Sequence, residues 1–410
     1  MTARAALSIL WLTIFTQLNS AQAAESSGNQ FEKPSSISAR EWWDHASWLQ
    51  TDLWEVRDEV QPNDFTNHYS IDTVYGPMEA WSDQNLLARL REIAALHWLR
   101  QQGAGRAGGR GTVAVATGKL ELVEDLATMP LATVFDVPRG ARALIRRAGA
   151  FALEERRHSS YTSGGPVRGL LGANDRKRAL AARLQVDPYS DNEPLQKELE
   201  RVALLEALPD FSIGLAIPGN GLFSILETGR ETRMMDAYLA SPSDLFLENR
   251  KTLQEIGVPK ELAADFLSIP FSTPAQQTIL TRALASLSEA EERTRLIAMA
   301  TDSSSREEFD FYRRTAELLS WYQANEEPVA RIESQGWLPV AVTTSGKRVL
   351  PFAVDLGGWC IDCGSALSVF ATEGRGNVVA VTGKLTPRAQ AELAQRGVAV
   401  LSAALASKAP

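Results

Sequence analysis

Hydrophobic residues recur at helical spacing through the middle of the chain. After Ser82, apolar side chains return every three or four residues up to Arg100, which predicts an amphipathic helix that begins at Ser82. Further segments with this spacing form a predicted helical body over residues 174–184, 194–208, 244–256, 259–267, 274–287, 290–299 and 305–322. Their connections are short and bounded by proline, and no fixed repeat emerges, so we expect a bundle and not a solenoid.

Shorter apolar runs at both ends of the chain predict strands. Residues 47–60 and 65–74 are interpreted as two antiparallel strands, and Gly76-Pro77 turns the chain into a third strand over 78–81. Near the C-terminus, β-rich runs cover 330–333, 338–343, 349–355, 378–382 and 398–401, with a helix at 388–396. The pattern predicts an α+β, mainly helical fold with an N-terminal antiparallel β-meander, a central helical body and a small C-terminal α/β module.

Changes in composition divide the chain into five predicted segments. The glycine-rich stretch at 103–111 lacks the preceding strand and the Gly-Lys-Ser/Thr of a P-loop, so we interpret it as a hinge. The predicted segments are a signal peptide over 1–23, the β-meander plus a helix over 24–102, the hinge with short helices and a linker over 103–172, the helical body over 173–325, and the α/β module over 326–410.

The first residues match a secretory signal peptide. Arg4 precedes an apolar run of about 14 residues, and the small-residue site Ala21-Gln22-Ala23 follows it. The run is shorter than the roughly 20 residues that a membrane span needs. We therefore expect an exported chain, periplasmic or secreted, that begins near Ala24 with a polar leader over 25–38 and has no transmembrane segment. An uncleaved N-terminal anchor is the alternative.

Charge and composition narrow the classes of function. The 42 Lys and Arg residues against 50 Asp and Glu residues give a net charge of −8, so the chain has no overall basic footprint for nucleic acid. Four histidines and two cysteines supply few soft metal ligands, and neither Gly-x-Ser-x-Gly nor His-Glu-x-x-His occurs. We expect no nucleic acid, no metal and no cofactor.

Two groups of residues before the C-terminal module have chemistry that allows binding. Trp42, Trp43, Trp48 and Trp54 form a candidate binding surface, because indole offers a flat apolar face with a polar edge; the alternative is that they fill the core of the small sheet. Asp187, Asp191 and Glu193 suit calcium, but they lack an EF-hand pattern. Capping of the helix at 194–208, by Asp191 or Asn192, explains these residues with fewer assumptions.

The most chemically suggestive motif is the sequence Leu-Gly-Gly-Trp-Cys-Ile-Asp-Cys-Gly at residues 356–364. Cys360 and Cys363 follow a predicted strand and open a possible helix. Three interpretations are open. The two cysteines form a structural disulfide, or they act as a redox pair in which Cys360 attacks and Cys363 resolves. In the third interpretation they bind a metal or remain as two reduced thiols. Trp-Cys-x-x-Cys resembles the thioredoxin active site. However, the chain after Cys363 is too short for a complete thioredoxin fold, and Pro387 opens a helix where thioredoxins place a proline at the start of a strand.

Three segments resemble a family of exported bacterial proteins without an assigned activity. They are LLARLREIAAL, DPYSDNEPLQKELERVA and FLSIPFSTPAQQTILTRAL, within residues 48–321. The resemblance implies a shared architecture and assigns no catalytic residue.

Two functions follow as expectations from the sequence. The first is an exported, non-enzymatic protein that binds or assembles with an envelope protein or surface component. The alternative is a periplasmic thiol–disulfide oxidoreductase that uses Cys360 and Cys363.

Overall fold

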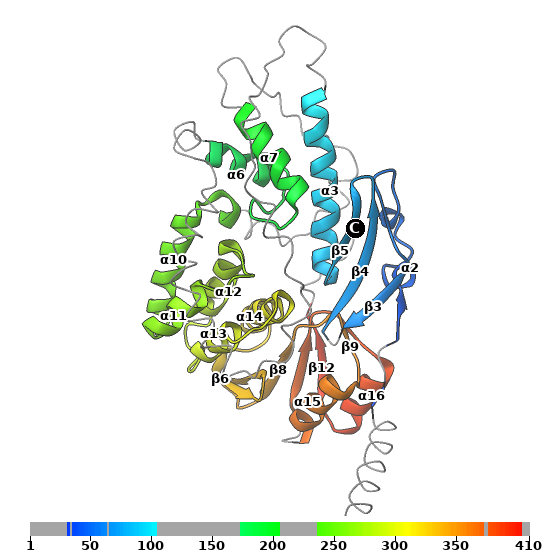
Figure 1. The fold of residues 1–410 in the computed structure, drawn as a ribbon. Helices are drawn as coiled ribbons and strands as arrows, with labels where there is room; N and C mark the ends of the chain where they lie inside the picture. Colours follow the sequence, from blue (N-terminus) through cyan, green and yellow to red (C-terminus); the bar gives the residue numbers. More distant parts are fainter. Residues whose placement is uncertain are drawn as a thin grey trace, which may run out of the picture.

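The computed structural model describes residues 31–32, 35–63, 65–104, 173–205, 236–372 and 376–403. Its fold is α+β and mainly helical, with an antiparallel N-terminal sheet and a mixed C-terminal sheet (Figure 1). The predicted fold class is therefore confirmed. The predicted signal peptide, its cleavage site near Ala24, and residues 105–172 of the predicted hinge and linker segment lie outside the described residues. Residues 103 and 104 of that segment belong to the helix α3 (Asp83–Ala104), so the prediction that the hinge begins at 103 is wrong.

The N-terminal sheet is built around one long strand, β4 (Thr66–Thr73). On one edge of β4, β2 pairs with its C-terminal end and β3 pairs with its N-terminal end; β5 lies on the other edge, and β1 extends the sheet beyond β3. All these pairings are antiparallel. The flanking elements are β1 (Ile37–Ser38), α2 (Ala39–Trp42), the 3-10 helix η1 (Ser47–Leu49), β2 (Trp54–Val56), β3 (Glu59–Asn63) and β5 (Gly76–Ala80).

The single strand predicted over 47–60 is wrong, because the chain there forms η1 and then two separate strands. The break between β2 and β3 lies at Asp58. The Asp58 carbonyl accepts a hydrogen bond from Ala39 N at 2.7 Å, and its carboxylate accepts one from Ser38 Oγ at 2.9 Å. These contacts hold Asp58 at the start of α2 and interrupt the ladder with β4.

Helix α3 (Asp83–Ala104) connects two cores. Ser82 Oγ accepts a hydrogen bond from Asn85 N at 3.0 Å, which caps the helix where the sequence predicts its start. Leu86 and Leu90, in the first half, pack against the N-terminal sheet, whereas Leu96 in the second half packs against the next two helices. These are α6 (Ala173–Arg183) and α7 (Glu193–Leu205).

In the part of the helical body that the structure describes, five longer helices follow α7. They are α10 (Pro242–Glu255), α11 (Lys260–Leu267), α12 (Pro274–Ser286), α13 (Thr294–Thr301) and α14 (Arg306–Asn325). Four of them begin and end within a few residues of their predicted bounds. Helix α13 begins later than predicted because Glu291 is extended and bridges to β6: Glu291 N donates to Ala330 O at 2.8 Å, and Ile332 N donates to Glu291 O at 3.0 Å.

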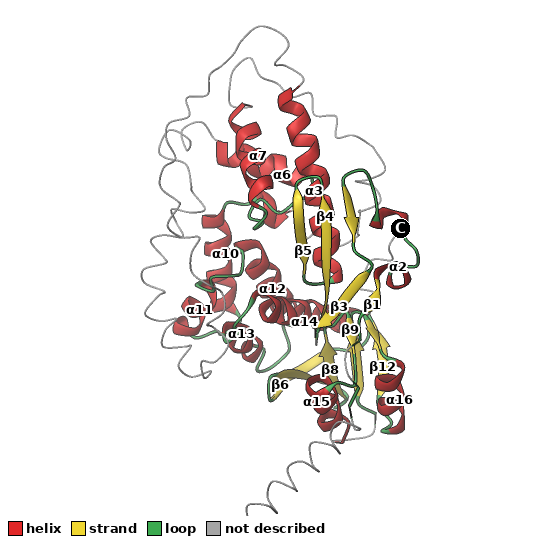
Figure 2. Cartoon of the chain, turned by 45° about the vertical axis from the view of Figure 1, so that its right-hand side comes forward, coloured by secondary structure: helices red, strands yellow, loops and turns green. Residues whose placement is uncertain are grey.

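The C-terminal module contains a five-stranded mixed sheet with the order β12-β10-β8-β7-β6 (Figure 2). Strands β8, β10 and β12 are parallel and alternate with α15 and α16, whereas β6 and β7 are antiparallel. The elements are β6 (Val329–Gln335), β7 (Leu338–Thr343), β8 (Arg348–Phe352), β9 (Leu356–Gly357), α15 (Ile361–Thr372), β10 (Val378–Val381), β11 (Lys384–Leu385), α16 (Pro387–Gln395) and β12 (Ala399–Ser402).

One continuous group of buried apolar side chains extends from α10–α14 into the C-terminal sheet. Helix α14 lies at its centre, with Phe309 and Leu319 buried in the same cluster as Val349 of β8 and Val379 of β10. The predicted division between the body and the module at 325/326 stays a prediction, and the described core is shared across it. Among the described helices, none is both long enough and apolar enough to span a bilayer.

Candidate functional site

The carboxyl ends of β8 and β10 lie side by side and place two polar residues together. Asp355 follows β8, and Thr382 directly follows β10. In parallel sheets, ligands and catalytic groups are most often found at this edge. The two loops approach each other closely at Gly383, where a Cβ would lie 2.1 Å from the Asp355 carbonyl oxygen. Glycine is therefore required at this position.

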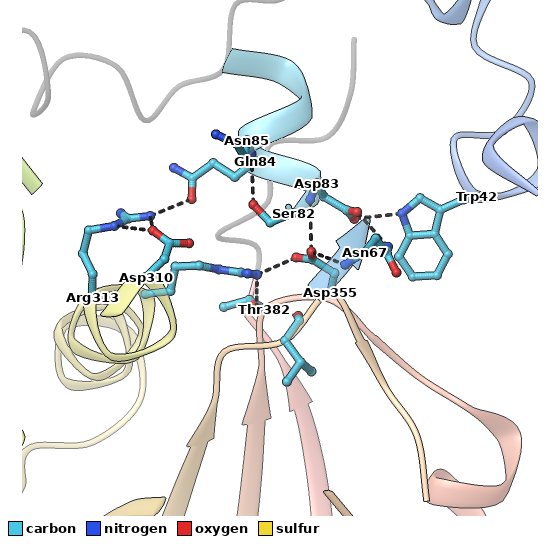
Figure 3. Close-up of polar contacts among 12 residues, drawn as sticks. Trp42, Asn67, Ser82, Asp83, Gln84, Asn85, Asp310, Arg313, Asp355 and Thr382 are labelled. Atoms are coloured by element: carbon cyan, nitrogen blue, oxygen red, sulfur yellow. Dashed lines mark hydrogen bonds and ion pairs between the residues drawn. The ribbon is translucent and has the colours of Figure 1, made fainter. Parts of the chain in front are cut away.

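Asp355 is buried and its carboxylate is held from three directions (Figure 3). Its Oδ2 accepts hydrogen bonds from the backbone N–H of Asn67 at 3.1 Å and of Asp83 at 3.0 Å. Its Oδ1 accepts from Arg314 Nη2 at 2.7 Å, and the same nitrogen donates to Thr382 Oγ1 at 3.0 Å. Burial alone would lower the pKa of the Arg314 guanidinium, but the charges of Asp355 and Asp310 and the hydrogen bond to Asp355 together raise that pKa, so Arg314 stays charged.

Asp83 opens α3 and forms a second buried carboxyl group beside Asp355. Its Oδ1 accepts from Asn67 Nδ2 at 2.8 Å, and its Oδ2 accepts from Trp42 Nε1 at 2.8 Å (Figure 3). Its Oδ1 also accepts from the Tyr69 hydroxyl at 2.6 Å. Burial, together with the nearby charge of Asp355, raises the pKa of Asp83 to about 7, although the three hydrogen bonds lower it. Asp83 therefore titrates near neutral pH.

We name these six residues, Asn67, Tyr69, Asp83, Arg314, Asp355 and Thr382, the junction cluster. It joins β4, the start of α3, helix α14 and the C-terminal sheet. A second arginine of α14 extends the contact: Arg313 Nη2 donates to Gln84 Oε1 at 3.2 Å, and its Nη1 pairs with Glu317 at 2.8 Å. The carboxylates of Asp83 and Asp355 accept hydrogen bonds from protein donors. The chemistry of the junction cluster therefore suits holding β4, α3, α14 and the C-terminal sheet together.

The cysteine pair lies at the start of α15, after the short strand β9 that follows Asp355. Cys360 directly precedes the helix, and its carbonyl accepts from Gly364 N at 2.7 Å. The backbone N–H of Cys363 points to Cys360 Sγ, with 3.4 Å between N and S. Cys360 is 5% exposed and Cys363 is 0% exposed. The adjacent Trp359 is also buried, beneath the guanidinium of Arg396 at 5.0 Å. The predicted disulfide stays a prediction.

The N-terminal segment Phe31–Glu32 lies against this turn, although the sequence pattern predicts only a polar leader there. Glu32 N donates to Trp359 O at 2.9 Å. Its carboxylate accepts hydrogen bonds from Trp359 N and from the Thr386 hydroxyl. The Phe31 ring lies against Gly364, where a Cβ would be only 3.0 Å from Phe31 Cδ1.

The four tryptophans singled out in the sequence are divided between two environments. Trp48 and Trp54 are buried in the core of the N-terminal sheet, where Trp54 Nε1 donates to Trp48 O at 2.8 Å. Trp43 packs edge-on against Trp48, with 5.0 Å between ring centroids. Trp42 instead reaches the junction cluster, and Lys384 Nζ lies 4.3 Å from the centroid of its ring. Their predicted binding role is untested.

The acidic loop before α7 packs against α3. Asn192 Oδ1 accepts from Leu195 N at 3.2 Å, as expected for a helix cap, and Asp191 pairs with Arg89 at 2.8 Å and also with Arg306. Burial raises the pKa of Asp187 to about 7. Within the described ranges, no group of three or more His, Cys, Asp or Glu side chains could hold a metal ion.

Comparison of the chain with protein-family models, with curated proteins and with solved structures finds no match. The site is therefore interpreted from its own geometry. Sequence reasoning found the cysteine pair by its spacing but missed the junction cluster and the contact of Glu32 with Trp359. A signal for part of the cluster was present, since Asp355 and Thr382 each end a valine-rich strand.

Proposed function

We propose that the protein is an exported thiol–disulfide exchange protein that acts through Cys360 and Cys363. The observation that supports this most strongly is the position of Cys360 at the start of α15, with the Cys363 N–H directed at its sulfur. Helix N-termini stabilise anions, and a thiolate is the attacking species in disulfide exchange. The proposed periplasmic or secreted location rests on the predicted signal peptide at 1–23.

The proposed reaction needs no group beyond the two cysteines and the substrate disulfide. The Cys360 thiolate attacks one sulfur of the substrate disulfide, so that bond breaks, a mixed disulfide forms and one substrate thiolate leaves. The Cys363 thiolate then attacks the Cys360 sulfur and releases the second substrate thiolate. The substrate is reduced by two electrons and the pair is oxidised to a disulfide. The reverse sequence oxidises a substrate dithiol.

A second candidate function is the exported, non-enzymatic protein that binds or assembles with an envelope component. The burial of both cysteines favours it, because buried structural cysteines are usually inert. In this case the pair would form a structural disulfide with only a local effect on stability.

Trapping of mixed disulfides tests the first proposal. In cells that express the full chain with Cys363→Ser, Cys360 lacks its resolving partner, so we expect reducible adducts on non-reducing gels. The matched control is Cys360→Ser, which leaves only the fully buried Cys363 and should give a single monomer band. A single monomer band from Cys363→Ser as well would contradict exchange and favour the binding protein.

A further inference from the structure

The surface beside the cysteine turn that holds Phe31–Glu32 has the features of a peptide-binding subsite. We call this surface, formed by Trp359, Gly364 and Thr386, the seat. Glu32 N donates a backbone hydrogen bond to the Trp359 carbonyl, a contact that an extended peptide can make whatever its side chains. Phe31 touches Gly364, after the second cysteine, and Glu32 bonds to Trp359, before the first. The segment therefore contacts both flanks of the dithiol turn.

Two further features give the seat a preference for an acidic side chain. The Glu32 carboxylate accepts from two donors that belong to different loops, the Trp359 N–H and the Thr386 hydroxyl. Thr386 is fixed in place because its oxygen also caps α16, accepting from Ala389 N at 3.2 Å. Hydrogen bonds to a carboxylate are roughly twice as strong as neutral ones, so an uncharged residue at this position binds less well.

We infer that this seat is the substrate-binding subsite for an extended protein segment in which an aromatic residue is followed by an acidic one, and that Phe31–Glu32 occupies it as an intramolecular competitor. The inference rests on the proposed exchange function, because it places the substrate segment next to Cys360. A tethered occupant has a high effective concentration, so it keeps the seat filled until a substrate displaces it.

Binding of a defined peptide tests this inference. The probe is a fluorescently labelled peptide with the sequence of residues 29–34, Asn-Gln-Phe-Glu-Lys-Pro, and its control carries Gln in place of Glu. The seat is opened in the full chain by the double substitution Phe31→Ala and Glu32→Ala. We expect the probe to bind the opened protein about tenfold or more tighter than the wild type. We expect the control peptide to bind about tenfold more weakly than the probe.

Two further variants keep the test independent of folding defects. Glu32→Gln preserves size and should give an intermediate gain in probe affinity, whereas Glu41→Ala, an exposed acid on α2, should give none. Alkylation of Cys360 by iodoacetamide should accelerate by about tenfold in the opened protein, because the side chains that contact both flanks of the cysteine turn are removed. Equal probe affinity for the wild type and the opened protein, or equal affinity for the two peptides, would overturn the inference.

The two proposals fail separately. Peptide binding is measured without any redox step, so probe binding in the absence of trapped adducts removes the exchange function and leaves the subsite. Trapped adducts from Cys363→Ser, with no effect of opening the seat, leave the exchange function and remove the subsite.

Discussion

Asp83 shows how one buried residue makes the stability of the protein depend on pH. The unfolded carboxyl ionises near its ordinary pKa of 3.8, whereas the folded one is raised to about 7 by burial and by the charge of Asp355. Between these values the folded state holds one more proton than the unfolded state. The stability contributed by this group is therefore present below the lower value and is lost as pH rises through the window.

We predict that Asp83→Asn flattens this dependence. In the wild type, Asp83 and Asp187 each hold one more proton in the folded state over this window, so each should lower the free energy of unfolding by up to about 1.4 kcal/mol per pH unit as pH rises from 5 to 7. The asparagine variant loses the contribution of Asp83 and keeps that of Asp187, so the decline should become shallower by up to about 1.4 kcal/mol per pH unit. Urea unfolding at a series of pH values measures it.

The control for this experiment is Asp72→Asn. Asp72 is an exposed carboxylate whose pKa is lowered by a hydrogen bond from Arg57, so it does not titrate above pH 5. This variant should keep the wild-type slope. A wild-type slope in Asp83→Asn would show that Asp83 is not the group responsible.

The helices and strands were largely predictable from the sequence because their signals are local. The helical period, the Ser82 cap and the cap at Asn192 are read within a few residues, and the structure places each as predicted. The break between β2 and β3 was not predictable, since Asp58 is held by Ser38 and Ala39, which lie on another strand and helix. Local alternation cannot show such a partner.

The candidate site was predictable only where its chemistry is contiguous in sequence. Cys360 and Cys363 are three residues apart and were found by their spacing. Asp83 and Asp355, by contrast, are 272 positions apart in the sequence and meet only because the start of α3 docks on the C-terminal sheet. Glu32 and Thr386 are farther apart still, with 354 residues between them, and neither has a distinctive motif.

The molecule as a whole is held together where the junction cluster meets the shared core. Arg314 links α14 to two loops of the C-terminal sheet through its hydrogen bonds to Asp355 and Thr382. Asp355 in turn accepts hydrogen bonds from the backbone of β4 and of α3. The elements joined by these residues come from both ends of the chain. Loss of one partner should therefore weaken both ends of the protein together.

We predict that Arg314→Leu destabilises the protein by about 3–5 kcal/mol, because it leaves Asp355 buried without its counter-charge. Hydrogen exchange followed by mass spectrometry should show lost protection in β4 and the start of α3 as well as in β8 and β10. The matched control is Arg282→Leu, whose partially exposed pair with Glu248 should contribute less than about 1 kcal/mol. Loss of protection confined to α14 and the C-terminal sheet would contradict the joining role.

The reduction potential of the Cys360–Cys363 pair is the most direct test of the proposed exchange function. It is measured by equilibrating the full chain with thiol–disulfide buffers of known potential and counting the remaining thiols by alkylation and mass. Exchange chemistry at the start of α15 predicts a value between about −120 and −270 mV, as in known exchange proteins. A value well below about −300 mV would mark a structural disulfide that resists reduction, and it would contradict the proposed function.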